Sequence, residues 1–136
     1  MNRIIFCSLL LLISCYSYSQ TQLEINNAEQ QKFLTADKEL NRIYKQILSD
    51  YKDDTAFVRN IKASQRLWVQ FRDAEMNMMY PQREPGYYGS IHPTCWAVYK
   101  TELTNERTKK LRKWLTGQEE GDSCSPSIKL RTNAEK

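Results

Sequence analysis

The chain has 136 residues, of which 26% are charged and 40% hydrophobic, and its formal net charge is +4. This length suits one domain and excludes two domains of ordinary size. The small excess of basic residues, mostly interleaved with acidic ones, argues against a nucleic-acid-binding protein.

The first 19 residues have the composition of a secretory signal peptide. A short basic start precedes an apolar run over residues 4–13, which is too short to cross a bilayer core that needs about 20 apolar residues. Small residues at positions 17 and 19 favour cleavage before Gln20 and a soluble periplasmic or secreted protein. The alternative is a membrane-anchored lipoprotein, because LISC at 12–15 resembles a lipobox in which Cys15 would be lipidated.

Removal of this segment would leave 19 basic and 16 acidic residues, a net charge of +3. The basic cluster at 109–113 is best explained as the end of a helix, where cations complement the helix dipole. Cys95 and Cys124 would remain as a pair in an oxidising compartment, where a disulfide between them is permitted. One histidine and two distant cysteines do not make a metal site, and no cofactor is expected.

Apolar residues recur at three- and four-residue steps from Phe33 to Tyr51, which predicts a long first helix. The segment TQLE at 21–24 matches a capping box and predicts that this helix begins at Thr21. N-cap candidates at 53–55 predict a second helix. Its inner stripe is expected to contain Phe57, Ile61, Ser64, Trp68, Phe71, Glu75 and Met78.

Residues 81–93 hold three of the four prolines and two of the four glycines, and they are expected to form a loop. A third helix is predicted from Pro93 to residue 116, since Pro suits a first turn and Gly117 suits the position after a helix end. The segment 117–136 has no apolar period and is expected to be mostly disordered. The sequence thus predicts an all-α, three-helix antiparallel bundle over residues 20–116, with a Pro/Gly loop between helices 2 and 3 and a disordered C-terminal tail.

Two charged residues fall on these apolar stripes, Glu75 in the second helix and Arg107 in the third. A buried charge without a partner is costly, so a cross-helix ion pair between them is expected. Asp37 and Arg72 complete the expected structural ion-pair network, with Arg72 either pairing with Asp37 or lying over Trp68. The alternative, a catalytic Glu75, is disfavoured because an arginine partner would keep it an anion and no companion nucleophile is found. The chain is therefore not expected to be an enzyme.

Five segments carry a resemblance to a known family: TQLEIN (21–26), ADKELNRIY (36–44), SQRLWVQFRDAE (64–75), GSIHP (89–93) and LTNER (103–107). In this order and at these spacings, the chain resembles the family of the lysozyme inhibitor LprI N-terminal domain, small exported helical proteins of bacteria. The family pattern falls on Asp37, Leu40, Asn41, Tyr44, Gln65, Arg66, Trp68, Arg72, Asp73, Leu103, Thr104 and Arg107.

The resemblance implies an envelope protein that contacts a protein partner, either a lysozyme that it inhibits or another envelope protein for which it has a structural role. The chain departs from the family at Ala28, Met76 and Tyr99, where many relatives have cysteines, so the usual disulfides of those relatives cannot form here. No nucleic-acid partner is expected, and membrane contact is expected only through lipidation of Cys15.

Five residues are the partner-binding candidates. Arg66 and Asp73 fall near the solvent side of the second helix, where they either contact a partner or only solvate the surface. Tyr87, Tyr88 and His92 belong to the Pro/Gly loop, which is the preferred contact element because tyrosine gives a large contact area at a modest entropy cost.

Overall fold

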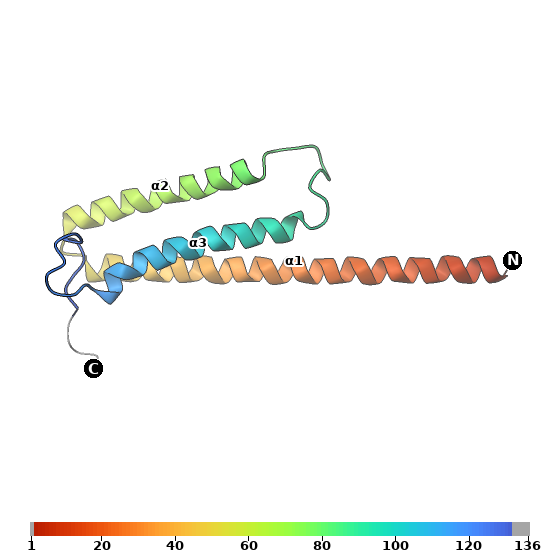
Figure 1. Ribbon diagram of the computed structural model, residues 1–136, viewed down its shortest axis with the longest axis horizontal. Coiled ribbons are helices and arrows are strands. Elements are labelled where there is room, and N and C mark those ends of the chain that lie inside the picture. Colours follow the sequence, from red (N-terminus) through yellow and green to blue (C-terminus); the bar gives the residue numbers. More distant parts are fainter. Residues whose placement is uncertain (1, 132–136) are drawn as a thin grey trace.

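The computed structural model describes residues 2–131, with side chains from residue 21 onward. Three helices follow one another: α1 (Asn2–Asp50), α2 (Thr55–Met79) and α3 (His92–Thr116). Helix α2 runs back against the direction of α1, and α3 returns in the direction of α1 (Figure 1). The predicted all-α, three-helix architecture is confirmed.

The start of α1 differs from the prediction. Thr21 lies inside the helix, because the backbone of residues 2–20 continues it without a break, so the capping box has no free helix end to serve. The signal-peptide and lipobox predictions for residues 1–19, Cys15 included, concern side chains outside those described. No helix in the described part of the chain is long and apolar enough to cross a membrane.

The other helix ends agree with the sequence signals. The side chain of Asp54 caps α2 by accepting a hydrogen bond from the backbone N–H of Phe57 at 2.9 Å. Pro93 occupies the first turn of α3. Gly117 follows the last turn with a φ of 72°, a conformation that favours glycine.

Helices α1 and α3 form the most closely packed pair of helices. Small residues let the two backbones approach each other: Ala97 is 1% exposed, and the threonines Thr104 and Thr108 are buried with it. Their hydroxyls donate to the carbonyls one turn earlier, at 2.8 and 2.9 Å, so both buried hydroxyls are hydrogen-bonded. The spacing of large apolar residues does not indicate this face of α3, because the residues buried there are small.

Helix α2 is held mainly by a few long side chains. Ile61 is buried among Leu40, Ile43, Ile47, Tyr51 and Leu111, and Phe57 and Trp68 pack against the same cluster. The predicted inner stripe is wrong at Phe71 and Met78, which are 54% and 64% exposed, whereas Met76 is buried. The reason is geometric, because a stripe drawn at 3.5 residues per turn drifts by about 20° per heptad on a straight helix.

Residues 117–131 form no helix, and their backbone folds back on the bundle. The N–H of Arg131 donates to Gln118 and the N–H of Gln118 donates to Lys129, at 2.8 and 3.0 Å. The backbone of Arg131 approaches Gly117 so closely that a Cβ there would lie 3.1 Å from it. These pairings involve backbone groups, so no periodic apolar pattern accompanies them in the sequence.

The disulfide that is permitted between Cys95 and Cys124 is not formed, and both thiols are free and exposed. Cys95 lies in the first turn of α3, and Cys124 lies in the tail beyond its last turn. The 21 residues from Cys95 to Thr116 span about 30 Å of helix, whereas a disulfide requires Cα atoms less than about 7 Å apart.

Candidate functional site

The loop of residues 80–91 connects α2 to α3 at the end of the hairpin opposite the α1–α2 turn (Figure 1). Gly86 and Gly89 have φ values of 85° and 69°, which allow two successive turns. The N–H of Tyr87 donates to Glu84 at 3.1 Å, and the N–H of Gly89 donates to Gly86 at 3.0 Å. The predicted Pro/Gly loop is therefore confirmed, and its backbone is ordered by internal hydrogen bonds.

An aromatic cluster stiffens this loop at its base. The ring of His92 stacks on Tyr88 with centroids 4.7 Å apart, and Tyr80 meets both rings edge-on at 5.9 Å from Tyr88 and 5.0 Å from His92. The hydroxyl of Tyr88 donates to the carbonyl of Pro81 at 2.8 Å. Burial raises the pKa of Tyr80 above its usual range. Tyr88 and His92 thus support the loop from within.

Tyr87 is the side chain that this cluster presents to solvent. It is 67% exposed, and its ring meets Tyr88 edge-on at 5.0 Å. The guanidinium of Arg83 lies over the Tyr87 ring, 5.7 Å from the centroid. A cavity of about 300 Å³ runs along the loop and His92. The loop therefore offers an aromatic ring and a cation together, and Arg83 was not among the candidates drawn from the sequence.

The other two partner-binding candidates lie elsewhere. Arg66 and Asp73 are both exposed in the middle of α2, and Arg66 is about 21 Å along the helix from Tyr80. Asp73 accepts hydrogen bonds from its neighbour Arg72, at 3.0 and 3.1 Å. The five candidates therefore form two separate surfaces, and only Tyr87, Tyr88 and His92 come together.

Part of the expected ion-pair network is present. Arg72 meets both expectations: its Nη1 lies 3.8 Å from an oxygen of Asp37, and its guanidinium lies 5.3 Å from the centroid of the Trp68 ring. The side chain of Arg72 is largely buried, at 12% exposed, and its contact with Asp37 bridges α1 and α2. This contact joins the two helices that have the fewest backbone contacts.

The expected ion pair between Glu75 and Arg107 is absent. Arg107 instead donates through Nε to Gln65 and through Nη2 to Ser64, both at 3.0 Å, and lies over Trp68. Glu75 accepts a hydrogen bond from the hydroxyl of Tyr99 at 3.1 Å. In the antiparallel hairpin of α2 and α3, Arg107 lies beside Gln65. Gln65 is ten residues before Glu75, which is about 15 Å along α2. The two residues are therefore too far apart to pair.

Two further residues were missed by sequence reasoning. Lys100 lies against the rings of Phe33 and Trp96, 4.7 and 4.3 Å from their centroids, and burial lowers its pKa. Burial, together with the hydrogen bond to Glu75, raises the pKa of Tyr99. In an antiparallel hairpin, the position of the connecting loop determines which residues of the two helices lie opposite each other. The position of the Pro/Gly loop was therefore the sequence signal that could have placed Tyr99 opposite Glu75.

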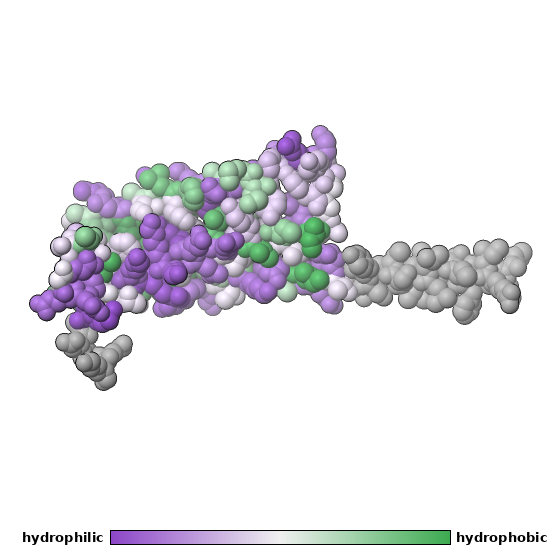
Figure 2. Space-filling view, viewed as in Figure 1, coloured by the Kyte–Doolittle hydropathy of each residue, from purple (hydrophilic) through white to green (hydrophobic). Residues whose placement is uncertain are grey.

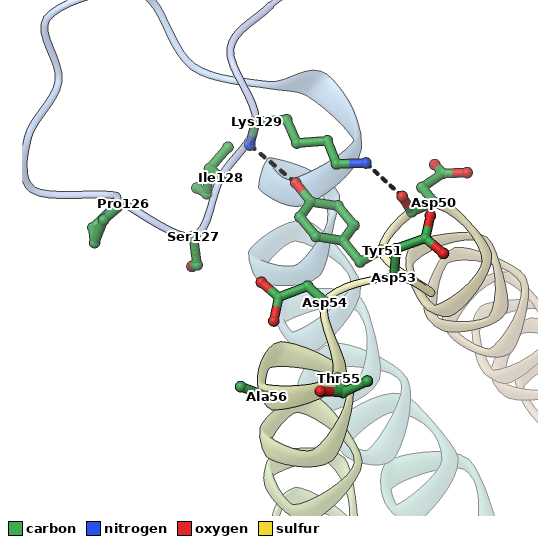
Figure 3. Close-up of a pocket in the computed structure, with 10 residues that line it drawn as sticks. All are labelled: Asp50, Tyr51, Asp53, Asp54, Thr55, Ala56, Pro126, Ser127, Ile128 and Lys129. Atoms are coloured by element: carbon green, nitrogen blue, oxygen red, sulfur yellow. Dashed lines mark hydrogen bonds between the residues drawn. The ribbon is translucent and has the colours of Figure 1, made fainter.

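A second cleft lies where the tail crosses the α1–α2 turn, with a volume of about 620 Å³ (Figure 3). The N–H of Lys129 donates to the hydroxyl of Tyr51 at 3.0 Å, and its ammonium group donates to the carbonyl of Asp50. Asp54 in the same cleft is occupied as the cap of α2. The described residues hold no group of three His, Cys, Asp or Glu side chains that could bind a metal ion.

Comparison with known proteins identifies the family of this chain. The family model described as "Lysozyme inhibitor LprI" matches residues 14–111, which include most of all three helices and the whole loop. An uncharacterized protein of Rhizobium meliloti (strain 1021) is 24% identical over 110 residues, covering 73% of this chain and 77% of that protein. No solved structure matches the chain closely enough to be compared. On the extent of the family match, the chain belongs to the lysozyme inhibitor LprI family.

Proposed function

We propose that this protein is an exported binding module that inhibits a lysozyme-like glycosidase by placing the loop of residues 80–91 in the entrance of its cleft. The observation that carries the proposal is the exposed Tyr87 on an internally hydrogen-bonded loop, with Arg83 beside it. Membership of the lysozyme inhibitor LprI family supports a glycosidase as the partner. The signal-peptide-like residues 1–19 support export.

The chemistry of the loop fits such a cleft. A glycosidase cleft holds two carboxyl groups that flank the scissile bond. A guanidinium can form paired hydrogen bonds with a carboxylate, and a tyrosine ring can cover apolar surface while its hydroxyl stays hydrogen-bonded. Arg83 and Tyr87 would supply these two contacts side by side. Covering the cleft would exclude the polysaccharide without any chemical step.

The stiffness of the loop also favours binding. The hydrogen bond from Tyr88 to Pro81 and the stack of Tyr88 on His92 fix the loop before it meets a partner. Less conformational entropy is then lost on association, so a small contact area yields more affinity. Tyr88 and His92 are positioning residues in this proposal, and Tyr87 is the contact residue.

Long-range electrostatics do not drive the proposed association. Residues 20–136 carry a net charge of +3, so a basic lysozyme would be weakly repelled. The complex would therefore depend on short-range contacts at the loop. We expect its affinity to change little, or to rise slightly, as the salt concentration increases.

The test is a turbidity assay in which several classes of lysozyme lyse cell walls in the presence of the purified protein. The expected result is slower lysis by at least one class, together with a complex on a sizing column. Unchanged lysis at excess protein and no complex would remove inhibition and leave a structural role in the envelope as the function to pursue.

Loop variants locate the contact. Tyr87→Ala and Arg83→Ala should each weaken inhibition by about tenfold, because central aromatic and arginine contacts dominate such interfaces. Arg59→Ala is the matched control, since Arg59 is an exposed arginine near the other end of α2. Equal inhibition by all three variants would place the contact outside the loop.

A further inference from the structure

Helix α2 exposes an apolar stripe that the other two helices do not cover. Leu67, Phe71 and Met78 are 59%, 54% and 64% exposed. Their spacing of four and seven residues places them within about 40° of one another around the helix. Figure 2 shows hydrophobic side chains along the α2 edge of the molecule. A contiguous stripe of this kind on a small protein marks an interaction surface.

The apolar stripe borders α3 and faces away from α1. Glu75 lies about 40° around α2 from Phe71, and it accepts the hydrogen bond from Tyr99 on α3. Arg72, which reaches Asp37 on α1, lies about 100° from Phe71 in the same direction of rotation. Around α2, the contact with α3 therefore comes first after the stripe, and the contact with α1 follows it. This order places the stripe on the side of the α2–α3 hairpin that is opposite α1.

The part of α3 next to this stripe is acidic. Glu102 and Glu106 are exposed, and they lie about 140° and 180° around α3 from Ala97, which is buried against α1. Tyr99 is on the same side, since burial and the hydrogen bond to Glu75 raise its pKa and the negative charges of Glu102 and Glu106 add to the shift. Neither of these two carboxylates forms an ion pair with a described side chain.

An acidic edge thus accompanies the apolar stripe, and its members are Glu75, Glu102 and Glu106. Because α2 and α3 are antiparallel and Glu75 meets Tyr99, Glu102 lies within about one residue of the level of Phe71. Glu106 lies in the same way near the level of Leu67. The carboxylates therefore recur about once per helical turn beside the stripe, which is about 17 Å long.

We propose that the apolar stripe and its acidic edge bind a cationic amphipathic peptide, which lies against α2 and α3 as a helix. Apolar side chains of the peptide at steps of three and four would pack on the stripe. Lysines or arginines on the adjoining flank, also about one turn apart, would pair with the acidic edge. About 12 residues of helix cover the length of this face. Met78 adds an adaptable side chain, which suits peptides of differing sequence.

The charges of the face select this occupant. The acidic edge would repel an anionic lipid surface, although the molecule as a whole is slightly basic. The guanidinium of Arg107 does not occupy the acidic edge, because it is half-buried and donates to Gln65 and Ser64. Lys110 lies about one turn past the end of the stripe at Leu67. The acidic edge is thus left to the cations of a partner.

Peptide binding to the full chain tests the proposal. The probe is a labelled model peptide of about 14 leucines and lysines, with the leucines at steps of three and four. Its control has glutamate in place of every lysine. We expect the fluorescence anisotropy to rise with the lysine peptide alone, the far-UV circular dichroism to show helix on binding, and the affinity to fall as salt is added.

Charge reversal tests the acidic edge. Glu102→Lys and Glu106→Lys together should weaken binding of the lysine peptide by about tenfold or more, and should let the glutamate peptide bind. Glu24→Lys with Glu120→Lys is the matched control, because it makes the same change in net charge at exposed positions of α1 and the tail. This pair should leave the affinity for the lysine peptide within about twofold of the wild type.

Two further variants test the apolar stripe and its independence from the loop. Phe71→Ser should abolish peptide binding without changing the melting temperature, since Phe71 is already exposed, whereas Leu34→Ser at an exposed position of α1 should have no effect. Tyr87→Ala should also leave peptide binding unchanged, because the loop begins at Tyr80, about 14 Å along α2 from Phe71. Peptide binding is in this way separated from inhibition by the loop.

Three results would overturn the proposal. The first is no binding of the lysine peptide, including the case in which Phe71→Ser instead abolishes a dimer of the chain. The second is equal binding of the lysine and glutamate peptides by the wild type, which would leave the acidic edge without a role. The third is binding that survives both Phe71→Ser and the reversal of Glu102 and Glu106.

Discussion

Arg107 enters the α2–α3 interface as a half-buried cation whose hydrogen-bond partners are neutral. Burial lowers its pKa from the usual value, and the guanidinium nevertheless stays charged at any ordinary pH. Gln65, Ser64 and the ring of Trp68 compensate for part of its lost hydration. The sequence indicated that Arg107 faces inward. It did not indicate the partner, because a helical wheel gives the face of a residue and not its level along the axis.

Substitution at the two residues separates the observed contacts from the expected ion pair. Arg107→Ala should lower the free energy of unfolding by about 1–3 kcal/mol, since it removes two hydrogen bonds and leaves Gln65 unsatisfied. Glu75→Gln should change it by less than about 0.5 kcal/mol, because the amide oxygen can still accept from Tyr99. Denaturant unfolding measures both. Equal and large losses would instead indicate that Glu75 and Arg107 depend on each other.

At the scale of the helices, the position of α2 explains where the sequence succeeded and failed. Its existence, its cap at Asp54 and its buried Ile61 could be predicted from local signals. The orientation of its second half could not, because the predicted stripe followed 3.5 residues per turn while the buried side follows Ile61, Trp68 and Met76. Apolar residues on both sides of a helix leave its rotation undetermined until the neighbours are known.

This orientation predicts unequal costs for two similar substitutions in α2. Ile61→Ala should lower the free energy of unfolding by about 2–4 kcal/mol, because it opens a cavity in the core. Phe71→Ala should change the stability of the monomer by less than about 0.5 kcal/mol, although it removes a larger side chain. Denaturant unfolding measures both. The reverse order would show that α2 is rotated from the orientation described.

The contact of Glu39 on α1 with Arg112 on α3 predicts a pH dependence. Hydrogen bonds from Arg42 and Arg112 lower the pKa of Glu39 from 4.5 to about 2. The stabilisation from a lowered pKa is fully present above about pH 4.5 and is lost as the pH falls toward 2. The melting temperatures of the wild type and Glu39→Gln should therefore differ at pH 6, by at most about 2 °C for so exposed a pair, and converge near pH 2. A difference in melting temperature that does not change with pH would show that the effect comes from packing and not from the charge of Glu39.

At the scale of the whole molecule, the tail and the loop mark opposite ends of α3. The tail is anchored at Tyr51, whose hydroxyl donates to the carbonyl of Trp114 and accepts from the N–H of Lys129. Such contacts join residues more than 60 positions apart, so no local pattern could predict them. The Pro/Gly loop, by contrast, was predictable because its turns depend on local residues.

The separation of these two ends predicts the chemistry of the cysteines. Cys95 and Cys124 are exposed and distant, so both should react with a thiol reagent in the native protein. Mass spectrometry of the labelled protein identifies the sites. Reduction should leave the melting temperature unchanged, and protection of both thiols until reduction would show that they pair.

Amide hydrogen exchange of the protein, with and without an inhibited lysozyme, tests whether the loop of residues 80–91 is the inhibitory element. Exchange should slow on binding in peptides covering residues 80–92, and Tyr87→Ala should remove this protection under the same conditions. Protection confined to α1 or to the tail, with residues 80–92 exchanging as in the free protein, would contradict the assignment of the loop as the inhibitory element.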